Sequence, residues 1–317
     1  MEKLFINRNV KALSVQEVFD RFLRDRECSN VSPYTIGYYE RCFRSFSKFY
    51  DVALPCSEIT LDTVRDYISW QKEQGNISDI SINTNLRGVR SIFYFAIQEG
   101  YLSEFKIKLI RAVKPIKPTY TEQELEKLLK KPNLKKCTFA QYRNWVIVNY
   151  LLGTGNRLET MSKLKVGDLD FESNQIALIH TKNKKQYFIP MSMELAKVLR
   201  EYLTYRKGNP DDCLFCSSYG APIGKATIQT QIQDYNKARG VTSTSIHMFR
   251  HTFAKMWILN GGDIMRLQTI LGHSTLEMVK EYVDMFCDDL QEGFSSHNPL
   301  DTLARKRKDG EKLRMRR

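Results

Sequence analysis

The chain has 317 residues, 42% of them hydrophobic and 11% aromatic, which is typical of a folded protein long enough for two domains. It has no apolar run of the roughly 18 residues that span a bilayer and no N-terminal secretory signal, which excludes an integral membrane protein and favours the cytosol. Its formal net charge of +13 favours a phosphate-rich partner, with nucleic acid ahead of a membrane surface.

The first hundred residues predict four amphipathic helices, and we place a helical domain over residues 12–100. Each helix starts at a residue type that caps helix N-termini, namely Ser14, Ser32, Thr60 and Ser81. Basic side chains lie among the aromatic residues of these helices, namely Arg41, Arg44, Lys48, Arg87 and Arg90. These five side chains could line DNA or could form a solvated face.

The stretch KLIRAVKPIKPTYTEQELEKLLKK has two prolines ahead of a capping box, so we expect a linker over residues 101–119. A second domain follows over residues 120–295, and a basic tail over residues 296–317. The second domain begins with helices. The periodicity of its hydrophobic residues then changes at NQIALIHTKNKKQYFIPM, where two short apolar runs flank a lysine-rich turn. This pattern predicts a β-hairpin inside a mainly helical domain.

The seven cysteines are an odd number without regular spacing, which indicates reduced thiols. Cys213 and Cys216 have the spacing of half a zinc site, but no second pair at ligand spacing accompanies them. Because apolar residues separate the two cysteines, a short strand explains them better, and we expect no metal ion.

Six polar residues of the second domain stand where helices, strands or turns end. They are Arg157 in GTGNR, Lys182 in HTKNKKQ, His247 and Arg250 in HMFRHTFA, His273 in LGHS, and Tyr282 in KEYVD. The spacing of three between His247 and Arg250 places both on one helical face. Taken singly, each residue has an ordinary structural explanation, and Tyr282 could be a core tyrosine whose hydroxyl found a partner.

In order and spacing, these six residues resemble the signature of the tyrosine recombinases, the family of phage integrases and Xer-type resolvases. The resemblance implies a mainly α fold, with an N-terminal four-helix SAM-like core-binding domain and a C-terminal α+β catalytic domain that contains a small β-sheet. One position departs from the family pattern, because Thr160 stands where the family has a supporting acid, with Glu159 one position earlier.

The resemblance also implies a function, which is site-specific recombination of DNA through a 3′-phosphotyrosyl intermediate without a cofactor. The expected partner is a double-stranded DNA recombination site, on which the protein assembles as a homotetramer with one dimer per site. The expected location is the bacterial cytoplasm, at the nucleoid. Integration, excision and resolution, in a transposon, a phage or a chromosome, are all compatible with the sequence.

Elementary chemistry supports a role for each of the six residues. The two guanidiniums can absorb charge on the non-bridging phosphate oxygens without a metal. Tyr282 would be the nucleophile, and a phenol with a reference pKa of about 10 needs a base, for which His247 is the natural candidate. Lys182 on the hairpin turn can protonate the departing 5′ oxygen, while His273 can bind the phosphate.

Two other interpretations keep parts of this pattern. A non-catalytic DNA-binding protein would use FAKMWILNGGDIMRLQTILGHSTLEMVKEYV as a helix-turn-helix, but Arg157 and Lys182 would then have no explanation. A type IB topoisomerase would keep the chemistry and relax DNA alone. After Tyr282 the chain has a few apolar residues and then a charged end, which on composition could be a solvated tail. The resemblance implies instead that this segment docks on a neighbouring subunit.

Overall fold

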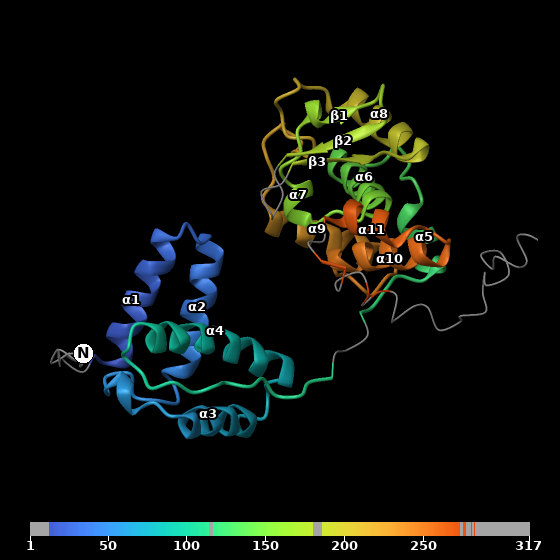
Figure 1. The fold of residues 1–317 in the computed structure, drawn as a ribbon. Helices are drawn as coiled ribbons and strands as arrows, with labels where there is room; N and C mark the ends of the chain where they lie inside the picture. Colours follow the sequence, from blue (N-terminus) through green and yellow to red (C-terminus); the bar gives the residue numbers. More distant parts are fainter. Residues whose placement is uncertain are drawn as a thin grey trace, which may run out of the picture. The chain divides into compact units, whose positions relative to one another are not determined.

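The computed structural model describes residues 13–113, 117–179, 186–272, 275, 276, 280 and 282, which form two compact units (Figure 1). Unit 1 is Met1–Pro115 and unit 2 is Ile116–Arg317. Helices dominate both units, and the described strands form one small antiparallel sheet in unit 2. The predicted fold class, mainly α with a small sheet in the second domain, is therefore confirmed. None of the described helices has the length and apolar character needed to cross a membrane.

Unit 1 contains the four predicted helices. They are α1 (Val15–Cys28), α2 (Pro33–Phe46), α3 (Leu61–Glu73) and α4 (Asp79–Gln98), with a short 3-10 helix, η1 (Cys56–Glu58), ahead of α3. Ser14, Ser32 and Thr60 cap their helices as predicted. The predicted start of α4 is wrong by about one turn, because Ser78 is the cap and its hydroxyl accepts from the Ser81 amide. Two serines three residues apart satisfy the same local rule, so the sequence does not separate them.

The packing of α2 against α4 sets the core of unit 1. Gly88 on α4 lets the two helices approach closely, because a Cβ at this position would collide with Cys42 Sγ on α2. Tyr38 Oη on α2 donates to Thr84 O on α4 at 2.8 Å. Aromatic and aliphatic side chains from all four helices fill the rest of this core. The two helices are thus a fixed pair, and side chains on their outer faces keep a defined spacing.

Part of the segment that was expected to be a linker packs on unit 1. Leu102 and Ile107 are buried in the core of that unit. The Asn83 side chain donates to Ile110 O at 2.9 Å and accepts from Ile110 N at 3.0 Å, which fastens the segment to α4. The segment therefore packs on unit 1 at least as far as Ile110.

Unit 2 is built around α6 (Phe139–Thr154), in which residues 142–148 are all buried. A helix that is buried on every side must be covered on every side, and α5, α8, α9 and α10 all contact α6. The other helices of the unit are α5 (Glu122–Leu129), α7 (Leu158–Met161), η2 (Val166–Asp168, a 3-10 helix), α8 (Met193–Arg206), α9 (Lys225–Ala238), α10 (Ile246–Leu259) and α11 (Ile264–Leu271).

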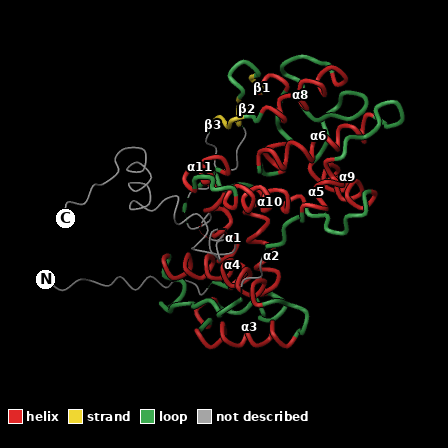
Figure 2. The backbone as a smooth tube through the Cα atoms, turned by 90° about the vertical axis from the view of Figure 1, so that its right-hand side faces the viewer, coloured by secondary structure: helices red, strands yellow, loops and turns green. Residues whose placement is uncertain are grey.

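The sheet of unit 2 has the antiparallel order β1-β2-β3, with β1 (Leu169–Asp170), β2 (Gln175–Leu178) and β3 (Tyr187–Pro190). The pairing of β2 with β3, in which Ile176 faces Ile189, confirms the predicted hairpin. Figure 1 and Figure 2 both draw α6 between this sheet and α10. The turn of the hairpin, residues 180–185, lies outside the described residues, and Lys182 with it.

The two cysteines considered as a zinc half-site stand at isolated antiparallel bridges. Cys213 pairs with Lys165, and Cys216 pairs with Pro222. Both are free thiols, and within the described ranges no three His, Cys or acidic side chains gather as they would around a metal ion. Their surroundings in the described structure are those of short extended segments.

Candidate active site

A sharp turn between α6 and α7 places the first predicted arginine. Gly155 ends α6 in the left-handed conformation, with φ of 61°. A Cβ on Gly155 would lie 2.6 Å from Phe253 Cδ1 on α10 and 2.8 Å from Leu271 Cδ2 on α11, so both helices pack directly on the turn. Arg157 follows as the N-cap residue of α7 and is half-buried.

Arg250 reaches the same turn from α10. Its side chain is 6% exposed, with Nη1 donating to Gly155 O and Nη2 donating to Leu271 O, both at 2.9 Å. Arg157 Nη1 also donates to Leu271 O, at 3.4 Å. Leu271 is the last residue of α11, where the unpaired carbonyls carry the negative end of the helix dipole. One carbonyl therefore holds both guanidiniums side by side.

The two guanidiniums make this place strongly positive. Burial lowers the pKa of Arg250 to about 10, the neighbouring Arg157 also lowers it, and Tyr282 and Tyr187 oppose this shift. An anion held by the two arginines would relieve their repulsion. The oxygens of a phosphate group match the paired N–H groups of a guanidinium, so this is a site suited to phosphate.

Tyr282 lies in a small hydrophobic cluster and is 2% exposed. The buried residues that pack with it are Ala254, Leu267 and Leu271. Its hydroxyl nevertheless has a polar partner, since Oη lies 2.8 Å from His251 Nδ1. The Nζ atom of Lys117 lies 4.8 Å from the centroid of the Tyr282 ring, within the range of a cation–π contact. The ring thus packs as a core residue while its hydroxyl is held by a titratable group.

His251 is the functional candidate that the sequence analysis missed. Burial lowers its pKa to about 4, and the charges of Lys117, His247 and Arg250 add to that shift. The imidazole is therefore neutral at pH 7, so one of its ring nitrogens can accept a hydrogen bond. The available signal was its spacing of four residues from His247, which puts both histidines on one side of α10.

The structure describes four of the six predicted catalytic residues, namely Arg157, His247, Arg250 and Tyr282. It brings the two arginines together at Leu271, and Leu271 also packs against Tyr282. His247 is exposed on α10. Lys182 and His273 lie outside the described residues, so their predicted roles stay predictions.

The position expected to carry a supporting acid holds Thr160, which is buried. The preceding residue, Glu159, is bound by Lys163 Nζ at 3.3 Å and by Lys225 Nζ, at the start of α9, at 3.5 Å. The hydrogen bond from Lys163 is the main reason that the pKa of Glu159 lies below its usual value. This carboxylate is therefore occupied by lysines, and a neutral side chain takes the expected acidic position.

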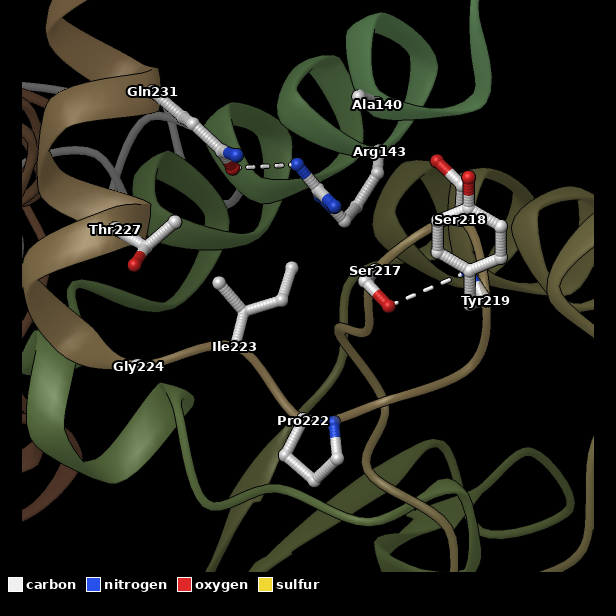
Figure 3. A pocket seen from close by; sticks show the side chains of 10 residues that line it. All are labelled: Ala140, Arg143, Ser217, Ser218, Tyr219, Pro222, Ile223, Gly224, Thr227 and Gln231. Atoms are coloured by element: carbon white, nitrogen blue, oxygen red, sulfur yellow. Dashed lines mark hydrogen bonds between the residues drawn. The ribbon is translucent and has the colours of Figure 1, made fainter.

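A separate pocket of about 300 Å³ opens between α6, α9 and the loop over residues 217–224 (Figure 3). Arg143 in its wall is 2% exposed, donating to Cys216 O at 2.8 Å and to Gln231 Oε1 at 2.6 Å. Figure 3 shows the bond between Arg143 and Gln231 across the pocket. Arg143 thus links the start of the loop to α9 through hydrogen bonds. None of the four described catalytic candidates lines this pocket.

Unit 1 carries the basic side chains that were considered for DNA contact. Arg41 and Arg44 on α2, Lys48 in the turn after α2, and Arg87 on α4 are exposed. Arg90 on α4 is partly buried. The guanidinium of Arg41 lies 5.8 Å from the ring centroid of Tyr34, which is 79% exposed. Because α2 and α4 are a fixed pair, the exposed basic side chains on these helices keep a defined spacing.

Comparison with protein families matches both units. A model described as the phage integrase family matches residues 118–287, and one described as a phage integrase SAM-like domain matches residues 14–112. The tyrosine recombinase XerC of Bacillus pumilus (strain SAFR-032) is 29% identical over 286 residues, covering 85% of this chain and 92% of the relative. The tyrosine recombinase XerC of Bacillus subtilis (strain 168) is 27% identical over 283 residues with the same coverage.

Solved structures with the same fold include two that were determined with DNA. The Tn1549 transposon integrase in complex with transposon right end DNA has a TM-score of 0.72 and 23% identity, covering 92% of this chain and 100% of that one. A lambda integrase dimer bound to a COC′ core site has a TM-score of 0.71 and 16% identity, covering 88% of this chain and 98% of that one. These similarities extend over both units.

Proposed function

The chain belongs to the phage integrase family and is a tyrosine-type site-specific DNA recombinase, and we propose that Tyr282 is the nucleophile of its strand cleavage. One observation carries this proposal. The Tyr282 hydroxyl is held at 2.8 Å by His251, directly after Arg250 on α10, in a cluster that shares Leu271 with the arginine pair. A purely structural tyrosine would not need a titratable partner beside two cations, of which Arg250 is buried and Arg157 half-buried.

The reaction follows from the chemistry of these groups. Tyr282 Oη attacks the phosphorus of a DNA phosphodiester, the bond to the 5′ oxygen breaks, and a 3′-phosphotyrosyl linkage forms. Arg157 and Arg250 bind the non-bridging oxygens, whose charge grows in the transition state. Lys182 protonates the departing 5′ oxygen, and His273 binds the phosphate. The new linkage keeps the bond energy, so a 5′ hydroxyl of another strand reverses the step without a cofactor.

Unit 1 supplies part of the DNA contact in this proposal. The exposed basic residues of α2, of the turn after it and of α4 attract phosphates, while Tyr34 beside Arg41 can pack against the sugar-phosphate backbone or a base. The overall charge of +13 adds attraction that is not specific for sequence. We propose a double-stranded recombination site as the substrate and a homotetramer, one dimer per site, as the active assembly that integrates, excises or resolves DNA.

Covalent capture tests the nucleophile. Nicked duplexes tiled across the DNA that flanks the gene are incubated with the protein, and adducts that survive denaturation are separated on a gel. Wild type should form an adduct, Tyr282→Phe should bind the same duplex without forming one, and EDTA should not change either result. Tyr235→Phe is the matched control, because it removes another buried phenol hydroxyl of unit 2, which donates to Leu128 O at 2.7 Å.

The outcomes separate three functions. A covalent adduct of Tyr282→Phe would refute the nucleophile assignment. Binding without any wild-type adduct would favour a helix-turn-helix DNA-binding protein. Adducts together with relaxation of supercoiled plasmid, but without strand exchange between two duplexes, would favour a type IB topoisomerase.

A further inference from the structure

Two elements of unit 2 close around the Tyr282 hydroxyl. From α10 comes His251, with Nδ1 at 2.8 Å from Tyr282 Oη and ring centroids 5.6 Å apart. From the segment before α5 comes Lys117, with Nζ over the Tyr282 ring. This segment is fastened to α10, because Tyr120 N donates to Thr252 Oγ1 at 2.9 Å, one residue after His251. The hydroxyl is therefore enclosed by groups with fixed positions.

We propose that His251, rather than the exposed His247, takes the proton from the Tyr282 hydroxyl during strand cleavage. The proposal rests on the function proposed above, in which Tyr282 is the nucleophile. A general base must lie within about 2.6 to 3.2 Å of the atom whose proton it removes. The distance of 2.8 Å from His251 Nδ1 to Tyr282 Oη meets that requirement. His247 lies on the same helix, one turn earlier, and is exposed.

A base must be unprotonated before it can act, and the surroundings of His251 ensure this. Burial lowers its pKa to about 4, and Lys117, His247 and Arg250 lower it as well. Among the described residues, Tyr282 also faces the ring. With the ring proton on Nε2, Nδ1 accepts the hydrogen bond of the tyrosine hydroxyl, which is the arrangement that precedes proton transfer.

Bound DNA should strengthen this base. The positive charges that lower the pKa of His251 are close to the arginines that would hold the phosphate. The negative charge of a phosphodiester opposes those charges, so the pKa of His251 rises from about 4 toward its ordinary value of 6.5. Proton transfer becomes more effective as the pKa of a base approaches the operating pH. The proposed base is thus weakest until a phosphate occupies the site.

The step balances in protons and electrons. Tyr282 Oη forms a bond to phosphorus as its proton moves to His251 Nδ1. The bond between phosphorus and the 5′ oxygen breaks with its electron pair on that oxygen, which receives a proton from Lys182. In the reverse step a 5′ hydroxyl attacks phosphorus and gives its proton back to Lys182, and the imidazolium of His251 returns the other proton to the departing tyrosine oxygen.

Nitrogen NMR of the DNA-free protein, labelled with ¹⁵N at histidine, tests the resting state. His251→Asn identifies the His251 signals by their absence, and if that variant does not fold, Tyr282→Phe marks the same signals by removing their hydrogen-bond partner. We expect an unprotonated Nδ1 and a ring that stays neutral at every pH above its pKa of about 4. A proton on Nδ1, donated to Tyr282, would overturn the proposal, because that nitrogen could not then accept one.

Cleavage rates measured across pH on the nicked duplex test the reaction itself. Asparagine at position 251 keeps a hydrogen-bonding group near the position of Nδ1 but cannot take up a proton. His251→Asn should slow adduct formation by about 10²- to 10⁴-fold and should remove the acid limb of the pH profile. His247→Asn, the matched change one turn earlier on α10, should keep that limb whatever its rate.

The two proposals fail in different ways. If wild type forms the adduct and His251→Asn keeps the wild-type rate and acid limb, the base assignment is overturned while the nucleophile assignment stands. If His247→Asn alone loses the acid limb, the base is His247. If wild type forms no adduct on any duplex, the proposed function and the role of His251 in it are both overturned.

Discussion

Replacing Arg250 by alanine should impair stability and cleavage together, whereas replacing Arg157 should impair cleavage alone. Arg250 is 6% exposed and makes two hydrogen bonds of 2.9 Å, to Gly155 O and Leu271 O. Arg157 is half-buried, with a longer bond of 3.4 Å to Leu271 O. A hydrogen bond from a charged group contributes about 1.5 to 3 kcal/mol, so the two bonds of Arg250 contribute about 3 to 6 kcal/mol.

Part of this loss is offset, because alanine also removes a desolvated charge and its repulsion by Arg157. We therefore expect Arg250→Ala to lower the free energy of unfolding by about 3 kcal/mol, the low end of that range, and Arg157→Ala to lower it by less than about 1 kcal/mol. In the transition state each arginine stabilises charge on a phosphate oxygen. Loss of one such donor costs about 2.7 to 4 kcal/mol, or about 10²- to 10³-fold in the rate of cleavage.

Urea unfolding and covalent capture measure the two effects separately. Tryptophan fluorescence in a Trp70→Phe background reports on unit 2, because the other two tryptophans, Trp145 and Trp257, both belong to it. Equal destabilisation by the two alanine substitutions would refute the structural part of the reasoning. Adduct formation by either variant within tenfold of the wild-type rate would refute the catalytic part.

Lys117→Met should raise the pKa of His251 above about 4, because it removes one of the charges that lower it. Since the folded-state pKa lies below the ordinary 6.5, the stability due to neutral His251 is present above pH 6.5 and is lost as the pH falls toward 4. The free energy of unfolding, measured with urea, should therefore fall less steeply across that window in the variant than in wild type. An unchanged slope would contradict the assignment. Gly155→Ala should destabilise unit 2 by about 1 to 3 kcal/mol, because the backbone of Gly155 is left-handed and an added Cβ would clash with Phe253 on α10. An unchanged melting temperature would be inconsistent with this. Truncation after Asp284 should keep binding to a single site but abolish cooperative assembly, whereas truncation after Leu303 should weaken binding and reduce its salt dependence. Gel-shift titrations at several salt concentrations distinguish these two effects. Normal synapsis after the longer deletion would refute docking between subunits.

The helices of this chain could be predicted from the sequence because capping and amphipathic periodicity are local. The capping boxes at Ser14 and Thr121 use only contacts between residues three apart, so they appear in the structure where the sequence placed them. The start of α4 marks the limit of this rule, because Ser78 and Ser81 both satisfy it. The attachment of Ile110 to Asn83 spans 27 residues and has no local signal, which is why this stretch was expected to be a linker.

The order and spacing of six residues along the chain, among them Arg157, Arg250 and Tyr282, were enough to predict the family, because such a combination is specific even when each residue alone is ordinary. Their mutual contacts were not predictable in the same way. Both guanidiniums share the carbonyl of Leu271, a backbone atom that no side-chain pattern identifies. The site is held together by the end of α11 as much as by its own residues.

Which histidine meets the Tyr282 hydroxyl was decided by tertiary structure alone. His247 and His251 are four residues apart on one helix, so every local rule treats them alike. Packing of Tyr282 and the segment of Lys117 against α10 encloses His251 and leaves His247 exposed. The lowered pKa of His251 follows from that enclosure, because desolvation and nearby charge depend on the surroundings that the folded chain assembles and not on the spacing of residues along it.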